Sequence, residues 1–404
     1  MRHIATDILV IGAGPAGAAA AQVLAAQGRD VLLVDRCAFP RDKVCGDALI
    51  PDAWRALDRL GLEHSVLRES RKSSAVRVYA PNGSYVSAGV DLGCLPRKRL
   101  DELMCEAAVA AGATFFAPYD VAQALESEGG VTGARFTHRQ GGDGLCVKAN
   151  FTLLATGAAA RPLEAFSVSR RRTASAVAAR IYVRVPQRIA EATRHISISI
   201  DRHICPGYGW IFPGPGEVFN VGVGYFTDSN RRPPATNPRQ LLARFVANFA
   251  PARDLMSVSR PLCDLRGAPL RTGLTGAALS RCGLLVLGEA AGLTYSFTGE
   301  GIGKAIESGM IAGEVLSRSA CDSLLSREAA ANAYAATIRA RFSSRFRAYR
   351  LAQEWLARPA LSDFLAWRGN AGRYVAEQLR SLLQETTDPR ALFSLFGVLK
   401  ALVL

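Results

Sequence analysis

A glycine-rich turn near the start of the chain constrains its fold more than any other feature. Residues 8–11 form an apolar run that predicts a buried parallel strand, and residues 18–26 predict a helix. Gly12, Gly14 and Gly17 lie between them with the spacing G-x-G-x-x-G. In this setting the first glycine makes a tight turn, the second lets a pyrophosphate approach the backbone, and the third lets helix and strand touch. The stretch therefore predicts a doubly wound α/β unit that binds a dinucleotide.

The segment that follows supports this interpretation. A second apolar run at 31–34 ends in Asp35, close to where an acidic side chain holds the ribose hydroxyls of a bound dinucleotide. The alternative is a glycine-rich turn without a ligand. Because the strand, the helix, the second strand and the acidic residue are all present, the sequence favours nucleotide binding.

Composition limits the partners of the chain. Its 404 residues suffice for two or three modules with cores, and 49% hydrophobic and 21% charged residues indicate a globular protein. The net charge of +14 is compatible with an anionic membrane surface, an acidic protein partner or an acidic substrate, and equally with a genome rich in G and C. No compact basic run is interleaved with aromatic residues, so we expect no nucleic-acid partner.

The cysteines and the hydropathy pattern indicate a reducing compartment. Nine cysteines form an odd count without C-x-x-C spacing, so we expect no disulfide framework and no metal site. The first strand begins too early for a signal peptide to precede it, and no segment has the roughly 18 consecutive apolar residues of a membrane span. We therefore expect a cytoplasmic protein, either free or peripheral at the inner face of the membrane.

A polar loop follows the second strand. Within it Cys45 lies between Lys43 and Asp47, next to Gly46. Loops at the carboxyl edge of such a sheet contact the ligand, so Cys45 is a candidate for a thiol that faces a bound cofactor. An inert small residue is the alternative, and the spacing alone does not exclude it.

The middle of the chain predicts a second, antiparallel sheet. Aromatic rings alternate along one of its strands, at Tyr208, Trp210 and Phe212, so the three rings point to one face. The next strand carries Gly222 and Gly224 on alternate positions. Rings opposite positions without side chains predict an apolar slot, although an ordinary core strand fits the same pattern.

A second glycine-rich junction between strand and helix lies far along the chain. The apolar run 284–287 leads through Gly288 and Glu289 to glycines 299, 301 and 303 and a helix of small residues. Its free N–H groups suit an anion or an electron-rich ring. Beyond residue 329 the chain is helical and rich in arginine. Its last segment, 391–404, is mostly apolar and fits either a terminal helix or a segment lying on a membrane.

Together these motifs resemble the geranylgeranyl reductase family of FAD-dependent oxidoreductases, within the larger hydroxylase-like flavoprotein group. The resemblance extends over nearly the whole chain, and its most specific part is Y-G-W-I-F-P at 208–213 followed by G-V-G at 222–224. It implies a catalytic role for Cys45 and non-covalent FAD held by Gly12, Gly14, Pro15, Ala16, Gly17, Asp35, Arg36, Cys45, Gly46, Arg97, Gly288, Glu289, Gly299, Gly301 and Ile302. It also implies a substrate cavity lined by Tyr208, Trp210, Phe212, Gly222 and Gly224.

The implied fold is α/β, or α+β overall: a doubly wound Rossmann-type FAD domain, an antiparallel-sheet substrate domain and C-terminal helices. We expect the FAD domain to be discontinuous, the substrate domain to have two segments, and the helical region to follow. The FAD domain should comprise 1–70, 95–165 and 268–320. The substrate domain should comprise 71–94 and 166–267, and the helical region 321–404. The implied reaction transfers a hydride from reduced FAD to the carbon–carbon double bonds of a bulky, apolar, isoprenoid-like substrate. NAD(P)H and another reductant both stay open as electron donor.

Two other functions stay open. One is an FAD monooxygenase that hydroxylates an aromatic or peptide-borne side chain, and the other is an electron-transfer flavoprotein without its own substrate pocket. The chain departs from the family pattern at Glu289, where the family has aspartate. It departs from the aromatic hydroxylases at Thr156-Gly157, where they carry Asp-Gly, which weakens the case for a phenol hydroxylase.

Overall fold

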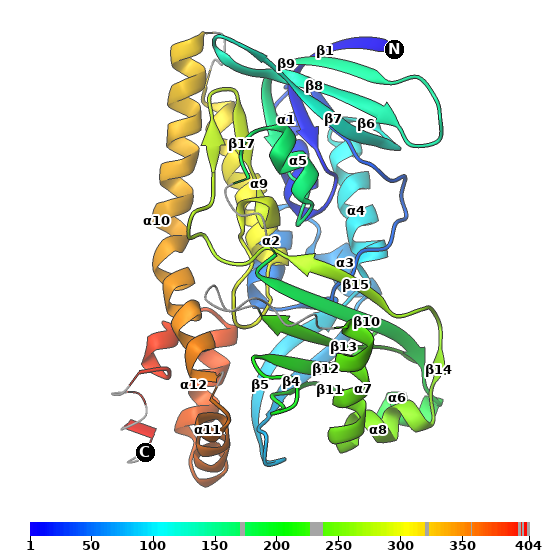
Figure 1. Cartoon of the computed structure of the whole chain (residues 1–404), viewed down its shortest axis with the longest axis vertical. Coiled ribbons are helices and arrows are strands. Elements are labelled where there is room, and N and C mark those ends of the chain that lie inside the picture. Colours follow the sequence, from blue (N-terminus) through cyan, green and yellow to red (C-terminus); the bar gives the residue numbers. More distant parts are fainter. Residues whose placement is uncertain are drawn as a thin grey trace.

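The chain folds around two sheets that lie one above the other along the long axis of the molecule (Figure 1). The structure is a computed structural model, and it describes residues 1–169, 174–226, 237–319, 323–356, 358–394, 397 and 400–401. Cys321 lies outside these residues, and the eight described cysteines form no disulfide with one another. The fold is the expected mixed α/β architecture, with the first sheet built around the glycine-rich turn.

The first sheet has a parallel centre in the order β17-β9-β1-β2-β6, with β16 antiparallel at one edge. Its interior strands are buried on both faces and therefore read as continuous apolar runs. β7 and β8 extend β9 as an antiparallel ribbon. The strands of this sheet are β1 (Arg2–Ile11), β2 (Val31–Val34), β6 (Thr114–Phe116), β7 (Tyr119–Ser127), β8 (Gly130–His138), β9 (Leu145–Leu154), β16 (Ser280–Arg281) and β17 (Leu284–Val286).

The helix of the glycine-rich turn is α1 (Pro15–Ala26), and it packs against α9 (Ile302–Ser317) and α4 (Arg97–Ala110). α1 and α9 approach closely because small residues face each other. A Cβ on Gly309 would lie 2.2 Å from the Ala16 carbonyl oxygen, and one on Gly313 would lie 2.6 Å from the Val23 side chain. This contact joins the two glycine-rich junctions, which are distant in sequence, at one edge of the sheet.

The second sheet is mostly antiparallel, in the order β14-β10-β13-β12-β11-β4-β5-β3, with β15 on β10 and one parallel pair, β4 with β11. It crosses the predicted domain limits at two places: β3 comes from the first segment assigned to the FAD domain, and β15 spans the limit at 267. Its strands are β3 (Ala48–Leu49), β4 (Arg71–Tyr79), β5 (Tyr85–Cys94), β10 (Ala176–Arg184), β11 (His195–Ser199), β12 (Gly207–Pro213), β13 (Val218–Phe226), β14 (Arg260–Pro261) and β15 (Arg266–Leu270).

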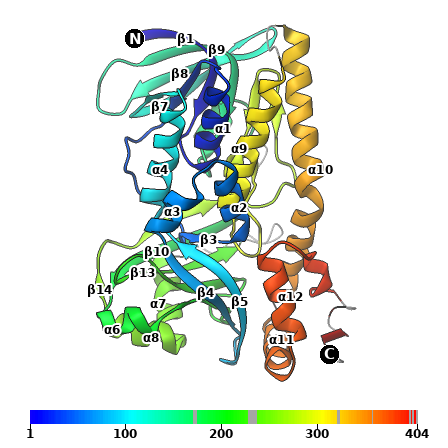
Figure 2. The same ribbon diagram turned by 180° about the vertical axis from the view of Figure 1, so that it is seen from behind.

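Helices cover this second sheet differently on its two sides. α7 (Pro238–Asn248) packs on β10 and β13, and its neighbour α8 (Ala250–Ser257) shares its apolar cluster. The C-terminal helices α11 (Pro359–Ala371) and α12 (Tyr374–Leu383) contact β5 (Figure 2). They follow α10 (Leu324–Leu356), which runs alongside the first sheet and down toward the second (Figure 1). The remaining elements are α2 (Pro51–Arg59), α3 (Glu63–Glu69), α5 (Ala160–Ala165), α6 (Gln187–Ala192), η1 (Gly288–Ala291) and η2 (Pro389–Ala391).

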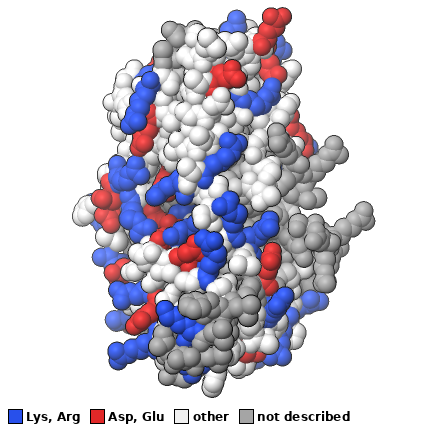
Figure 3. Space-filling view, turned by 90° about the vertical axis from the view of Figure 1, so that its left-hand side faces the viewer, with Lys and Arg blue, Asp and Glu red and all other residues white. Residues whose placement is uncertain are grey.

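The surface carries the basic excess of the sequence in a dispersed form. On the face drawn in Figure 3, lysine and arginine are more frequent than aspartate and glutamate, but the two signs are interspersed. Among the described residues, no helix is long and apolar enough to cross a membrane. Within the same residues, no cluster of three or more histidine, cysteine or acidic side chains is arranged to hold a metal ion.

Candidate functional site

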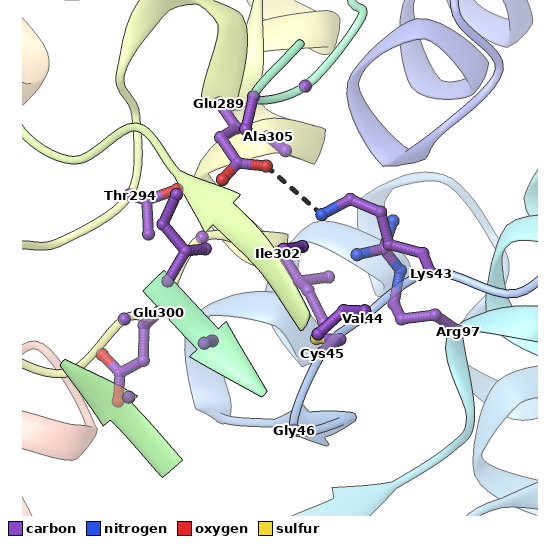
Figure 4. Close-up of a pocket in the computed structure, with 18 of the residues that line it drawn as sticks. Lys43, Val44, Cys45, Gly46, Arg97, Glu289, Thr294, Glu300, Ile302 and Ala305 are labelled. Carbon is purple, nitrogen blue, oxygen red and sulfur yellow. Dashed lines mark hydrogen bonds and ion pairs between the residues drawn. The ribbon is translucent and has the colours of Figure 1, made fainter. Parts of the chain in front are cut away.

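A single cavity of about 1230 Å³ joins both sheets and the C-terminal helices. Its walls include the glycine-rich turn, the cysteine loop, the aromatic strand and the second glycine-rich junction, which the sequence places far apart. Figure 4 labels residues of the cysteine loop and of the second glycine-rich junction around its interior, together with Arg97. Because sites for one small ligand usually measure roughly 300–1000 Å³, this cavity has room for a large cofactor and a substrate together.

The three glycines of the first turn serve different purposes. Gly12 has a φ of +101°, and a Cβ there would lie 2.5 Å from the Ala155 carbonyl oxygen. A Cβ on Gly17 would lie 1.8 Å from the Gly12 carbonyl oxygen. Gly14, in contrast, opens into the cavity, where a Cβ would meet only guanidinium atoms of Arg41 and Arg97, at 3.6 and 3.8 Å. Gly14 is therefore the position that leaves room for a diphosphate.

Charged side chains surround this opening. One carboxylate oxygen of Asp35 accepts a hydrogen bond from the Ala13 amide at 2.8 Å, and the other lies 3.5 Å from the Arg41 guanidinium. Arg97 makes two hydrogen bonds to Asp101, at 2.7 and 2.9 Å. Burial lowers the pKa of Arg97, but Asp101 and Cys45 outweigh this and raise it, so the guanidinium stays charged. Two fixed cations beside a glycine opening suit a diphosphate, and Asp35 suits a ribose.

The second glycine-rich junction closes the other side of the cavity. Glu289 points into it and pairs with Lys43 at 3.4 Å, as the dashed line in Figure 4 marks. The N-terminus of α9 opens beside it, where Gly301 and Ile302 line the wall. The N–H groups of a first helical turn have no partner within the helix and carry partial positive charge, so this end can stabilise negative charge on a ligand ring. Gly288 does not line the cavity, because it packs against Ala16.

A hydrogen-bond network fixes the cysteine loop to the aromatic strand. The Asn220 side-chain amide donates to the Cys45 carbonyl oxygen at 2.7 Å and to the Asp47 carboxylate at 2.8 Å. Its oxygen accepts from the Trp210 indole N–H at 2.9 Å, and the Tyr182 hydroxyl donates to Asp47. Burial raises the pKa of Asp47 to about 6 in spite of these bonds, which oppose the rise. Cys45 thus faces the cavity from a loop whose backbone is held on several sides.

The aromatic strand forms the wall beside this loop. Tyr208, Trp210 and Phe212 all line the cavity, and successive ring centroids lie 6.1 and 6.0 Å apart. The predicted slot above Gly222 is filled, because the Trp210 ring covers that glycine and a Cβ there would lie 2.3 Å from the ring. Gly224 does line the cavity. The two glycines thus let the indole ring of Trp210 approach the sheet closely.

The cavity continues beyond the rings into an apolar chamber. Its walls are β4, β5 and β11 on one side and the C-terminal helices on the other, and Leu392 and Phe393 line it too. The chamber-facing side chains of the helices are Ser362, Leu365, Ala366, Val375, Leu379, Leu382 and Leu383. We call this part of the cavity the distal chamber. Residues 395–396, 398–399 and 402–404 of the apolar terminal segment lie outside the described residues.

The structure brings nearly all of the predicted site residues together. Of the expected cofactor residues, thirteen line the cavity: Gly12, Gly14, Pro15, Ala16, Asp35, Arg36, Cys45, Gly46, Arg97, Glu289, Gly299, Gly301 and Ile302. Gly17 and Gly288 instead make the close packing contacts that support it. Sequence reasoning missed Arg41, Glu300 and the chamber-facing positions of α11 and α12. The only sequence signal for Arg41 was its position four residues before Cys45, in the same polar loop.

The site therefore fits FAD on its own geometry. The Gly14 opening with its two guanidinium groups accepts the diphosphate, Asp35 is placed for the ribose of the adenosine half, and the cavity extends from there past Cys45 to the N-terminus of α9. FAD is a dinucleotide of this kind, with a redox-active ring at the far end from the adenosine.

Comparisons with known proteins agree with this geometry. Residues 5–253 match the family model described as "FAD binding domain". The menaquinone reductase of Mycolicibacterium smegmatis is 32% identical over 323 residues, covering 77% of this chain and 76% of that protein. The digeranylgeranylglycerophospholipid reductase 2 of Methanosphaera stadtmanae is 28% identical over 329 residues, covering 79% of each.

A solved structure supports the fold independently. The geranylgeranyl bacteriochlorophyll reductase-like protein of Thermoplasma acidophilum superposes with a TM-score of 0.78, covering 99% of this chain and 96% of that one. At 22% identity this likeness concerns the fold alone.

Proposed function

The chain belongs to the geranylgeranyl reductase family of FAD-dependent oxidoreductases, and from this premise we propose that it saturates carbon–carbon double bonds in an isoprenoid chain carried by a larger lipid or quinone. The distal chamber is the observation that carries the proposal. It is lined mostly by aliphatic and aromatic side chains, it belongs to the same cavity as the FAD region, and it lies between the second sheet and two C-terminal helices.

The residues of the site divide the work between binding and orientation. Arg41 and Arg97 would hold the diphosphate of FAD, and Asp35 would hold its ribose. The bound cofactor would supply the hydride. The N-terminus of α9, where Gly301 and Ile302 line the cavity, would stabilise negative charge on the reduced ring. Tyr208, Trp210 and Phe212 orient the chain that is to be reduced.

The chamber also serves the chemistry by excluding water. Hydride transfer to carbon requires that the reduced cofactor meet the substrate before it meets oxygen or a proton source from bulk solvent. An apolar chain that fills the distal chamber displaces water from this path. The same chamber speaks against an electron-transfer flavoprotein without a pocket of its own, since such a protein has no use for it.

The proposal is tested without oxygen. The protein is reduced chemically with dithionite under anaerobic conditions and mixed with a menaquinone or with a geranylgeranyl-bearing lipid. Mass spectrometry of the product then decides the reaction type. Once any quinol formed from menaquinone has been re-oxidised to the quinone, we expect a remaining gain of two hydrogens for each isoprenoid double bond that reacts, at a rate that does not depend on oxygen.

The control uses the same lipids with reduced free FAD, which shows the background reaction. A product with one additional oxygen atom, formed only in air, would identify the protein as a monooxygenase and overturn the proposal. Reduced FAD that is oxidised without any change in either lipid would also contradict it.

A further inference from the structure

Glu300 is an acidic residue that lines the cavity apart from the diphosphate opening and the aromatic wall. It belongs to the tight turn between Thr298 and Gly301, just before α9, and its side chain lines the cavity (Figure 4). The turn is rigid: the Tyr295 amide donates to the Glu300 carbonyl oxygen at 2.9 Å, and the Gly299 amide donates to the Tyr295 carbonyl oxygen at 3.1 Å. The backbone from which the Glu300 side chain projects is therefore fixed.

That place is the junction of the FAD region with the aromatic wall. The Tyr208 hydroxyl donates to the Thr298 carbonyl oxygen, and a Cβ on Gly299 would lie 2.9 Å from the same hydroxyl. Glu300 thus follows directly on the segment that touches the first ring of the wall. Cys45 reaches the same region from a different loop (Figure 4).

The surroundings of Glu300 favour its neutral form. Lys304, four residues further along the chain, does not form an ion pair with Glu300 in the described residues. Its ammonium group instead pairs with Asp52 and with Glu385, at 2.8 Å each. Burial, together with the charges of Asp52 and Glu385, raises the pKa of Glu300 to about 8, although a hydrogen bond with Thr298 and the charge of Lys304 oppose the rise. A carboxyl group in this state carries a proton at neutral pH and can give it away.

Saturation of a double bond needs such a group. Two electrons and one hydrogen arrive as hydride at one carbon, the π bond breaks, and the other carbon must take a proton from an acid. On the premise of the proposed function, we propose that Glu300 is the catalytic acid that donates this proton. The O–H bond of Glu300 breaks as the new C–H bond forms, and water that enters after product release returns a proton to the carboxylate.

The groups around Glu300 determine in which direction turnover changes with pH. The titratable groups that face it are Asp52 on α2, Lys304 on α9, Glu385 after α12, Tyr208 on β12 and Tyr349 on α10. Burial raises the pKa of both tyrosines, so they stay neutral through the working range. The acid is present below a pH of about 8 and is lost above it, so turnover falls as pH rises through that value.

The first measurement does not depend on a substrate. Infrared difference spectra of the FAD-loaded protein between pH 6.5 and 9.5 detect the carbonyl stretch of a buried protonated carboxyl group. We expect a component of this band that titrates near pH 8 in the wild type and is missing in Glu300→Gln, whereas buried Asp47, with a pKa of about 6, contributes only at the acid end of the range in both proteins. Glu314→Gln, an exposed glutamate on α9 paired with Arg59, is the matched control and should keep the band. A wild type without such a band overturns the proposal.

The second measurement follows turnover of the chemically reduced enzyme on an isoprenoid lipid. Glu300→Gln should bind FAD and lipid normally, lose at least about 100-fold in the rate of saturation, and lose the alkaline limb of the pH profile. Cys45→Ala should keep that limb. A Glu300→Gln protein as fast as the wild type overturns the proposal even if the proposed function holds, whereas a wild type that saturates no lipid rejects the proposed function and this role with it.

Discussion

At the scale of single residues, Gly14 is a position where a substitution should impair cofactor binding without impairing folding. Its φ is −76°, and a side chain there meets no backbone atom, in contrast to Gly12 and Gly17. Gly14→Val should therefore fold but lose FAD affinity by at least about 100-fold, or about 2.7 kcal/mol, because the side chain takes the place of the diphosphate. Flavin absorbance and a thermal melt of the same sample measure the two effects.

The matched control for this variant is Gly89→Val. Gly89 lies on β5 with nothing within 4 Å of a Cβ, so the substitution should leave the protein yellow. A Gly14→Val protein that retains flavin would contradict the placement of the diphosphate.

The fingerprint glycines and Asp35 could be predicted from the sequence because they act within one contiguous strand–turn–helix–strand unit. Arg41 and Glu300 could not, since their places depend on contacts across the fold. Arg41 matters because it lies between Asp35 and Asp101, at 3.5 and 3.0 Å. Glu300 matters because Lys304, its neighbour in sequence, is taken by acids from α2 and from the end of α12.

At the scale of elements, we expect the C-terminal helices, which line the distal chamber, to limit the length of the substrate. Ala366 of α11 is 3% exposed and lines the distal chamber. Ala366→Phe should project a ring into the chamber and cost a long chain about 1–3 kcal/mol of binding, or about 5–150-fold in kcat/KM, because the chain and the ring compete for one space. Shorter isoprenoid chains should be spared, and FAD content should not change.

Ala360→Phe, at an exposed position of the same helix, is the control and should affect neither substrate. Equal losses for short and long chains would show that the helices do not limit the length of the substrate.

These helices also show what could not be predicted from the sequence. Their inward apolar positions are those of any packed helix, and only the tertiary structure shows that they face a cavity. The slot predicted above Gly222 failed for a related reason, since the pattern did not show that Trp210 fills it.

At the scale of the whole molecule, the net charge of +14 and an apolar substrate point to contact with an anionic bilayer. The charge is dispersed rather than gathered in one patch (Figure 3), so we expect weak attraction that many residues share. Such attraction depends on the Debye length, which falls from about 30 Å at 0.01 M salt to about 3 Å at 1 M. The protein should therefore sediment with anionic vesicles at low salt and be released as salt is raised.

An apolar contact would add a component that salt does not remove. Trp367 on α11 is 57% exposed, next to the chamber-forming positions of that helix, and tryptophan is suited to the interfacial region of a bilayer. Truncation before Leu392 is a poor probe, because Leu392 and Phe393 line the chamber and their loss would open it. Trp367→Ala leaves the chamber intact and should weaken vesicle binding by up to about tenfold, with neutral vesicles as the control in the same sedimentation assay. Binding that is indifferent to salt, to lipid charge and to Trp367 would mean that the substrate reaches this protein by another route than the membrane surface.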